Sequence, residues 1–233
     1  MNKFLIIQCF DDGSHQGPPF KELSEITSKS LIEYCNLHKY YYAIQSDGLD
    51  KTRHSSWSKV FLTRKYLADY DWVWCLDVDT MIMNQNIKLE DIVDENYDVI
   101  MTCYQGNIDG LNTGSIIYKN TPWTHELLKE IYDDSKYPIG GPNVFFEQSA
   151  IIQYYKNNPD QQHHFKIEHV RKFNSHFHLG MRSLGYNFEY GDFVLHTPGS
   201  SNDYRVPAFK KLQDWIIKPG QPIREEFNVE MHG

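Results

Sequence analysis

The feature that most constrains this chain is an apolar run, Trp72–Leu76, that ends in two carboxylates one residue apart, Asp77 and Asp79. Five consecutive apolar residues predict a strand buried on both faces, as in a parallel sheet covered by helices. The carboxyl ends of such strands form the rim where α/β proteins bind ligands. Carboxylates are the oxygen ligands that hard divalent cations prefer. The motif therefore predicts a cation at the rim that holds an anionic ligand such as a nucleoside diphosphate.

Apolar strand-like runs alternate with helical periodicity along most of the chain. The patterns predict strands at 4–10, 40–44, 72–76, 97–103 and 115–118, and short strands at 164–170 and 193–195. They predict helices at 20–38, 89–93, 121–132 and 147–156, and one more helix that begins at Ser55-Ser56. This alternation predicts an α/β fold with a mostly parallel, Rossmann-like central sheet and helices on both faces.

The composition limits the partners and the compartment. A formal net charge of −8 without an evident basic face argues against a nucleic-acid partner. The same acidity would repel a diphosphate unless a bound cation offset the local carboxylates. The 4 cysteines form no C-x-x-C pair, which argues against a zinc knuckle and is simplest in a reducing compartment. No signal peptide or transmembrane segment is evident, which predicts a cytoplasmic location, or the Golgi lumen if an anchor has been removed.

Polar residues follow three predicted strands, as Asp11-Asp12, Ser46-Asp47 and Asp77-Val78-Asp79. Because the carboxyl ends of parallel strands meet at one edge of a sheet, we expect the three ends to converge on one nucleotide site.

Three further motifs carry chemistry, and each has a plainer alternative. In the stretch 110–115, Asn112 lies between two glycines and can both donate to and accept from sugar hydroxyls, although an ordinary turn has the same pattern. At the start of a helix, Glu147 and Gln148 could orient a hydroxyl or stabilise a developing cation, although a carboxylate there also suits the helix dipole. His196 could complete a metal site begun by Asp77 and Asp79, although most histidines are structural.

Two other groups are of interest. Five clustered histidines are expected at the surface or in an acceptor cleft: His163, His164, His169, His176 and His178. Six aromatic residues could stack on sugar rings or simply pack in the core: Tyr104, Trp123, Tyr137, Phe145, Phe146 and Phe177.

At five places in order, the chain resembles the family 34 glycosyltransferases, which include fungal α-1,2-galactosyltransferases and plant xyloglucan xylosyltransferases. The matching pieces are Trp57-Ser58-Lys59, the run from Asp69 through Asp77-Val78-Asp79 to Asn84, Gly110–Ser115, Glu147–Ala150 and Gly191–Gly199. The resemblance implies a GT-A fold, a UDP-sugar donor, an oligosaccharide or glycoconjugate acceptor, Mn²⁺ (with Mg²⁺ as the alternative) and retention of the anomeric configuration.

The resemblance also implies roles for residues. Asp77, Asp79 and His196 match the metal ligands. The donor site would comprise Phe10, Lys59, Asp77, Val78, Asp79 and Gly199, and the sugar and acceptor site Asn112, Thr113, Gly114, Glu147 and Gln148, of which Gln148, Glu147 and Asn112 would be catalytic. The chain departs from the family at Phe146, where a second acidic residue is common. In the family, a lysine that contacts the diphosphate often follows the glycine that Gly199 matches. Here Ser200 and Ser201 follow Gly199 instead, and Arg205 is a candidate substitute for that lysine.

The expected domain organisation is one GT-A domain over residues 1–233. Its nucleotide-binding half would cover about 1–105 and its acceptor-binding half about 106–218, with a surface tail at 219–233.

The expected function is that of a retaining glycosyltransferase that moves a galactose- or xylose-type sugar. Same-face attack is favoured over a covalent intermediate, because the amide of Gln148 is a poor nucleophile. The alternatives are a nucleotide-sugar hydrolase, a nucleotidyltransferase and a non-catalytic protein that binds nucleotide or carbohydrate. The acidic Asp11-Asp12-Gly13 after the first strand argues against a nucleotidyltransferase, in which a basic, glycine-rich loop is usual.

Overall fold

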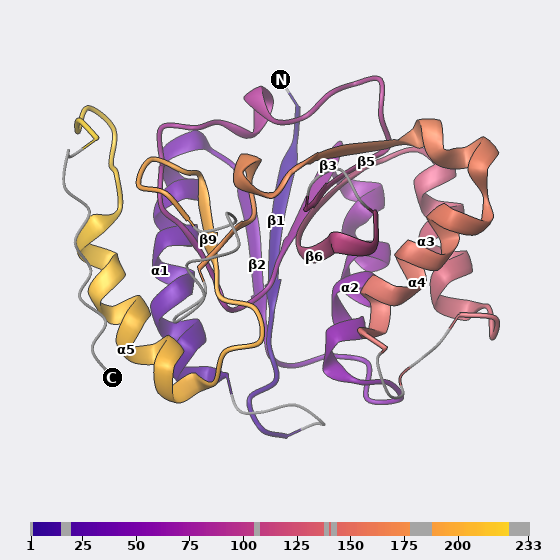
Figure 1. The fold of residues 1–233 in the computed structure, drawn as a ribbon, viewed down its shortest axis with the longest axis horizontal. Helices are drawn as coiled ribbons and strands as arrows, with labels where there is room; N and C mark the ends of the chain where they lie inside the picture. The colour runs from indigo at the N-terminus through magenta and orange to yellow at the C-terminus, as the bar shows by residue number, and fades with distance from the viewer. Residues whose placement is uncertain are drawn as a thin grey trace.

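The computed structural model describes residues 2–14, 20–104, 108–137, 140, 144–177 and 188–223. Its centre is a six-stranded sheet with the order β2-β1-β3-β6-β5-β7 (Figure 1). The strands are β1 (Phe4–Cys9), β2 (Tyr41–Gln45), β3 (Trp72–Leu76), β5 (Val99–Cys103), β6 (Leu111–Lys119) and β7 (Phe165–His169). Only β6 runs antiparallel to its neighbours, β3 and β5, and the other pairings are parallel. The predicted mostly parallel α/β sheet is therefore confirmed.

Helices cover both faces of this sheet, as Figure 1 shows. On one side lie α1 (Lys21–His38) and α5 (Asn202–Leu212), and on the other α2 (Ser58–Tyr66), α3 (Pro122–Asp133) and α4 (Phe146–Asn157). Short 3₁₀ helices are η1 (Ser55–Trp57), η2 (Leu67–Asp69), η3 (Leu89–Asp91), η4 (Ile108–Gly110), η5 (Pro159–His164), η6 (Val170–Lys172) and η8 (Gln213–Trp215). In the part of the chain that the structure describes, no helix combines the length and apolarity needed to cross a bilayer.

The central strands β1, β3 and β5 are buried on both faces because their alternate residues enter different cores. In β1, Leu5 and Ile7 pack with residues of α2, α3 and α4, whereas Phe4 and Ile6 pack with residues of α1. Alternate side chains of a strand point to opposite faces, so a continuous apolar run fills both cores at once. This arrangement explains why the strands could be predicted from uninterrupted apolar runs.

A second, smaller sheet places a histidine beside the acidic motif. It comprises β4 (Thr80–Ile82), β9 (Val194–His196) and β8 (Ser175–His176), in the order β4-β9-β8. Because β4 and β9 are antiparallel, Thr80 lies opposite His196. The backbone N–H of Thr197 also donates to the Asp79 carbonyl at 3.1 Å. Residues more than a hundred positions apart are thus held side by side.

The direction of β6 decides what faces the end of β3. Since β6 is antiparallel to β3, Ser115 pairs with Leu76, and the Asp77 N–H donates to the Gly114 carbonyl at 2.8 Å. The strand predicted at 115–118 begins earlier, at Leu111, because Leu111 and Asn112 already pair with β5. The plainer alternative of an ordinary turn at 110–115 therefore does not describe this stretch.

Other differences are local. Helix α5 was not predicted, and the sequence there, with Pro207 inside the helix, lacks a clear apolar period. The cap of η1 is not a serine, because the His54 side chain accepts from the Ser56 N–H. The predicted tail 219–233 lies partly, and His178 wholly, outside the described residues. The division into two halves stays a prediction.

Candidate active site

A cleft of about 300 Å³ opens at the carboxyl ends of the neighbouring strands β1 and β3. This edge of the sheet is the usual ligand site of α/β proteins. The lining residues come from five regions: Cys9, Phe10, Asp11 and Phe20; Ser55, Ser56 and Lys59; Asp77, Val78 and Asp79; Asn112, Thr113, Phe145, Phe146, Glu147 and Gln148; and His196, Pro198, Gly199 and Arg205. Every predicted site residue except Gly114 is among them. Of the three strand ends that were expected to converge, Asp11 and Asp77-Val78-Asp79 line this cleft, whereas Asp12, Ser46 and Asp47 do not.

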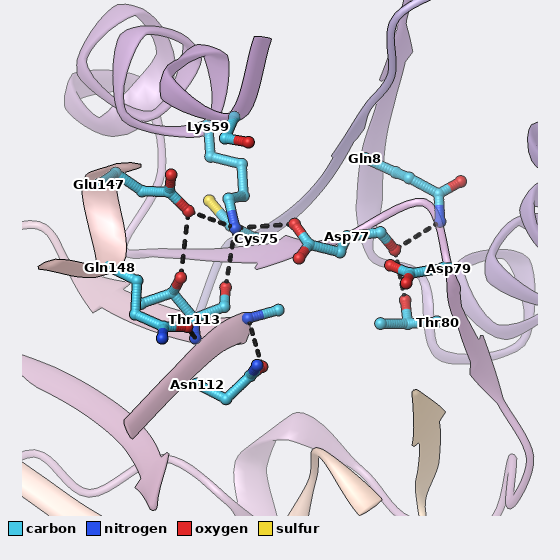
Figure 2. A network of polar contacts seen from close by, with 12 residues as sticks. Gln8, Lys59, Cys75, Asp77, Asp79, Thr80, Asn112, Thr113, Glu147 and Gln148 are labelled. Atoms are coloured by element: carbon cyan, nitrogen blue, oxygen red, sulfur yellow. Dashed lines mark hydrogen bonds and ion pairs between the residues drawn. The ribbon is translucent and has the colours of Figure 1, made fainter. Parts of the chain in front are cut away.

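Lys59 is a buried cation shared between two carboxylates (Figure 2). Its Nζ lies 2.7 Å from Asp77 Oδ1 and 2.7 Å from Glu147 Oε1, and it donates to the Thr113 carbonyl at 3.1 Å. All three ammonium hydrogens therefore have a partner. Burial would lower the pKa of Lys59, but the two carboxylates raise it well above its ordinary value. Lys59 is thus a permanent positive charge that ties α2, β3, β6 and α4 together.

Glu147 is held inside the protein rather than at its surface. Its side chain accepts from the Thr113 hydroxyl at 3.1 Å, and the residue is 4% exposed. Burial raises the pKa of Glu147 and the nearby Asp77 raises it further, whereas Lys59 opposes both. Its other oxygen, Oε2, is buried and has no hydrogen-bond partner among the residues described. An unsatisfied buried oxygen is costly, so a ligand hydroxyl that donates to it would be bound favourably.

Gln148 is fixed through its carbonyl oxygen. Gln148 Oε1 accepts from the Thr113 N–H at 3.2 Å, so β6 orients the side chain that α4 supplies. Glu147 and Gln148 are therefore positioned by the same residue of β6, one through its hydroxyl and the other through its backbone.

Asp79 lies on the opposite side of Asp77 from Glu147, as Figure 2 shows. Its Oδ1 is 3.3 Å from His196 Nε2, and its Oδ2 is 2.7 Å from Arg205 Nη2. Burial would raise the pKa of Asp79, but His196 and Arg205 outweigh it and hold the pKa below its ordinary value. The buried guanidinium of Arg205 is itself fixed by two hydrogen bonds to the Thr197 carbonyl, at 3.1 and 3.0 Å.

A fully buried asparagine, Asn174, determines which nitrogen of His196 faces Asp79. Asn174 Nδ2 donates to the Asn112 carbonyl at 3.2 Å, and a carbonyl can only accept, so the Asn174 amide is oriented with Oδ1 toward His196. His196 Nδ1, at 2.9 Å from that oxygen, must therefore carry a hydrogen. In the neutral ring, Nε2 is then a lone-pair donor aimed at the acidic pair, as in metal-binding histidines.

The donor set fits a divalent cation. One ligand atom each from Asp77, Asp79 and His196 lie within 4.8 Å of one another. Each carboxylate also uses one oxygen to meet a cationic side chain, Lys59 or Arg205, which orients it and leaves the other oxygen for a metal. Two carboxylates and one imidazole suit a metal such as Mn²⁺ that keeps further positions for ligand oxygens.

Gly114 has a steric role that the sequence did not indicate. A Cβ at this position would lie 2.7 Å from His196 Nδ1 and 2.9 Å from Asn112 Oδ1, which is closer than real Cβ atoms approach. Its N–H also donates to Asn112 Oδ1 at 2.9 Å. The expected sugar contact of Gly114 stays a prediction, but the absence of a side chain there is what lets β6 pass so close to the His196 ring.

Two site residues were missed or only partly recognised. Asn174 belongs to no motif, and nothing in the sequence near it could have indicated its role. Arg205 was considered as a diphosphate contact, and the structure pairs it with Asp79.

His176 was expected at the surface or in an acceptor cleft, but it is buried, and its ring meets that of His196 edge to face. Of the candidate stacking residues, Tyr137 is buried and Phe145 is exposed.

Comparison with solved structures gives the class of fold. The chain is similar to a glycosyltransferase involved in the glycosylation of the major capsid of PBCV-1, with a TM-score of 0.66, 16% sequence identity, and coverage of 90% of this chain and 99% of that one. The fold is therefore the GT-A glycosyltransferase fold, as expected.

The family follows from sequence comparison. The family described as "Protein of unknown function, DUF273" matches residues 32–216, so the chain belongs to it. The chain is also 25% identical over 223 residues to an uncharacterized alpha-1,2-galactosyltransferase of Schizosaccharomyces pombe, which covers 76% of this chain and 63% of that protein. It is 30% identical over 133 residues to xyloglucan 6-xylosyltransferase 2 of Arabidopsis thaliana, covering 53% of this chain and 28% of that protein. The expected resemblance to family 34 enzymes is confirmed, and the chain spans less than two thirds of either relative.

We predict that Lys59→Met destabilises the fold by roughly 3–5 kcal/mol at neutral pH, because it leaves two carboxylates close together without their cation. Without Lys59 the pKa of Glu147, already raised above 4.5 by burial, would rise further. A raised pKa in the folded state stabilises it at low pH, and that stability is lost as the pH rises through the raised value. The deficit relative to the wild type should therefore be smaller at pH 5 than at pH 8.

Urea denaturation at both pH values measures this deficit. Lys65→Met, at an exposed position of the same helix, is the matched control and should be nearly neutral. A deficit for Lys59→Met that is small, or that does not depend on pH, would contradict the prediction.

We predict that Gly114→Ala weakens Mn²⁺ binding at least tenfold, because the new methyl group must displace the His196 ring or β6. Calorimetric titration with Mn²⁺ measures the effect, and circular dichroism checks that the variant is folded. Gly140→Ala is the control, since among the described residues a Cβ there would first meet the Phe146 ring, at an ordinary 3.6 Å. Equal affinities in a folded Gly114→Ala variant would mean that His196 is not a ligand.

Proposed function

We propose that this chain is a metal-dependent, retaining glycosyltransferase that moves a galactose- or xylose-type sugar from a UDP-sugar to a hydroxyl group of a glycan or glycoconjugate. The observation that carries the proposal is the convergence of the Asp77–Asp79–His196 group with Glu147 and Gln148 in one cleft of a GT-A fold. The similarity to an α-1,2-galactosyltransferase and a xylosyltransferase supports the choice of sugars. We also propose that about 1–105 form the nucleotide-binding half and about 106–218 the acceptor-binding half.

In this proposal Asp77, Asp79 and His196 hold the cation, with Mn²⁺ favoured and Mg²⁺ as the alternative. The ion would supply Lewis-acid stabilisation of the charge that develops on the UDP leaving group. Arg205 pairs with Asp79 and adds a positive charge to the same wall of the cleft. Because the chain has a net charge of −8, these local cations are what make the cleft suitable for a diphosphate.

The sugar would lie between the acidic pair and the start of α4. Glu147 Oε2 would accept a hydrogen bond from a sugar hydroxyl, which would satisfy its unmet bonding capacity. Asn112 Oδ1 is already engaged by Gly114 and Asn174, so the amide nitrogen of Asn112 is the atom suited to a sugar oxygen. These groups would orient the donor sugar without reacting with it.

Same-face attack by the acceptor remains our preferred route to retention. Glu147 Oε1 is engaged by Lys59 and Thr113, which favours a role in orientation over one as a nucleophile. The carboxamide of Gln148 is weakly nucleophilic and is fixed by Thr113. Its carbonyl oxygen keeps a second lone pair, which would stabilise the positive charge of an oxocarbenium-like transition state. The leaving phosphate would then take the proton of the attacking hydroxyl.

We predict that wild-type protein binds UDP only with Mn²⁺ or Mg²⁺, and that Asp79→Asn weakens this binding at least tenfold, about 1.4 kcal/mol. Calorimetric titration of UDP with and without metal tests the prediction. Asp91→Asn, at an exposed position, is the matched control and should behave like the wild type. If UDP does not bind under any metal condition, the proposed function is wrong.

We predict that Gln148→Ala lowers turnover about 10²-fold, near 2.7 kcal/mol, while UDP affinity changes less than twofold. The assay follows UDP release from UDP-galactose and UDP-xylose, with sugar transfer to glycan acceptors detected by mass spectrometry. Gln153→Ala, farther along the same helix, is the control.

A wild-type rate for Gln148→Ala would exclude a catalytic role for Gln148. UDP binding without UDP release or sugar transfer would favour a non-catalytic binding protein. UDP release without transfer to any acceptor would instead indicate a nucleotide-sugar hydrolase.

A further inference from the structure

We propose that Phe145 is the acceptor platform of this cleft, on which the apolar face of a neutral sugar ring stacks beside the donor site. The inference rests on the proposed function, because it assigns the second substrate of the same cleft.

The side chain of Phe145 is presented to solvent from a fixed backbone. The residue lines the cleft with Glu147 and Gln148, yet 66% of its surface is exposed. A single exposed apolar residue needs no explanation in itself. Here, however, the Phe145 N–H donates to Ser149 Oγ at 2.8 Å, and its carbonyl accepts from the Gln148 N–H at 3.0 Å. The backbone from which the ring projects therefore has a defined position relative to Gln148.

The backbone of the next residue, Phe146, is strained in the turn that places Phe145. Its φ of 48° lies in the left-handed region, where a bulky side chain is strained by roughly 1–3 kcal/mol. The Phe146 ring stacks on His54, with centroids 3.8 Å apart and planes at 8°. This stack joins the start of α4 to the segment before α2. The strained turn leaves Phe145 at the solvent side of the cleft while Glu147 lies buried within it.

The chemistry of this end of the cleft suits a neutral sugar. A pyranose ring has C–H groups on its faces and hydroxyl groups at its edge, and the negative face of an aromatic ring attracts C–H groups. The adjacent carboxylate, Glu147, is buried and paired with Lys59, so it does not make this end a site for a cation. The phenyl ring would bind the sugar face, and the amide nitrogen of Gln148 would be a polar partner for its hydroxyls.

The arrangement of the cleft favours the acceptor over the nucleobase as the partner of Phe145. Two other aromatic residues, Phe10 and Phe20, line the cleft where β1 leads to α1, which is the usual nucleotide side of an α/β sheet. Figure 2 shows Gln8 of β1 and Asp79 on one side of Lys59, with Glu147 and Gln148 on the other. A nucleotide at the β1 end would place its diphosphate near Asp79 and its sugar toward Gln148. The Phe145 end is then left for the acceptor.

Saturation-transfer NMR in the presence of UDP and Mn²⁺ tests the inference. The probes are cellotetraose, methyl β-D-galactopyranoside and methyl α-D-mannopyranoside, and UDP affinity is measured on the same samples by calorimetry. We expect saturation of the ring C–H protons of at least one probe, a signal at least fivefold weaker in Phe145→Ala, and recovery in Phe145→Trp. Phe61→Ala, at an exposed position of α2 outside the cleft, is the control and should match the wild type. UDP affinity should change less than twofold in every variant.

The outcomes separate the inference from the proposed function. If UDP binds but no probe gives a signal, or the signal is unchanged in Phe145→Ala, the inference is wrong and the proposed function stands. If Phe145→Ala weakens UDP binding tenfold, Phe145 contacts the nucleotide and the inference is again wrong. If UDP does not bind to the wild-type protein, the proposed function fails, and the inference with it.

Discussion

The cleft depends on one buried ammonium group that two carboxylates share. Lys59 meets Asp77 of the acidic motif and Glu147 of α4 at 2.7 Å each, and it also donates to the backbone of β6. Removing charged groups from water costs several kcal/mol for each ion, and only close pairing with good geometry offsets that cost. Because one lysine compensates both carboxylates, the segments that carry them are held in a fixed relation. The acidic motif and the start of α4 therefore form one site.

A second set of buried polar contacts fixes the other half of the cleft. Arg205 holds one oxygen of Asp79, and His196 approaches the other. Asn174 orients His196, and its amide in turn donates to Asn112 of β6. Each residue that would hold the metal is thus positioned by a neighbour that would not. Such supporting contacts are what allow a site to bind a cation and a diphosphate without rearranging.

Much of the fold could be predicted because its signals are local. The run Trp72–Leu76 had to be a buried strand, and the carboxylates after it had to lie at the rim of the sheet. Asn174 illustrates the opposite case, since it has no neighbouring motif and acts only through residues from distant segments. The strand predicted at 115–118 was too short for the same reason, since it begins at Leu111. Glycines favour turns locally, but pairing with β3 and β5 overrode that preference.

The sequence by itself determined the alternation of strands and helices, the order of the motifs and the residue types that could bind a metal. These depend on the spacing of apolar residues and on side-chain chemistry, which are written directly in the chain. Only the tertiary structure decided that β6 runs antiparallel, that Lys59 joins Asp77 to Glu147, and that Phe145 is exposed while Phe146 stacks on His54. Strand direction and the pairing of buried charges depend on contacts between distant segments, which no local pattern encodes.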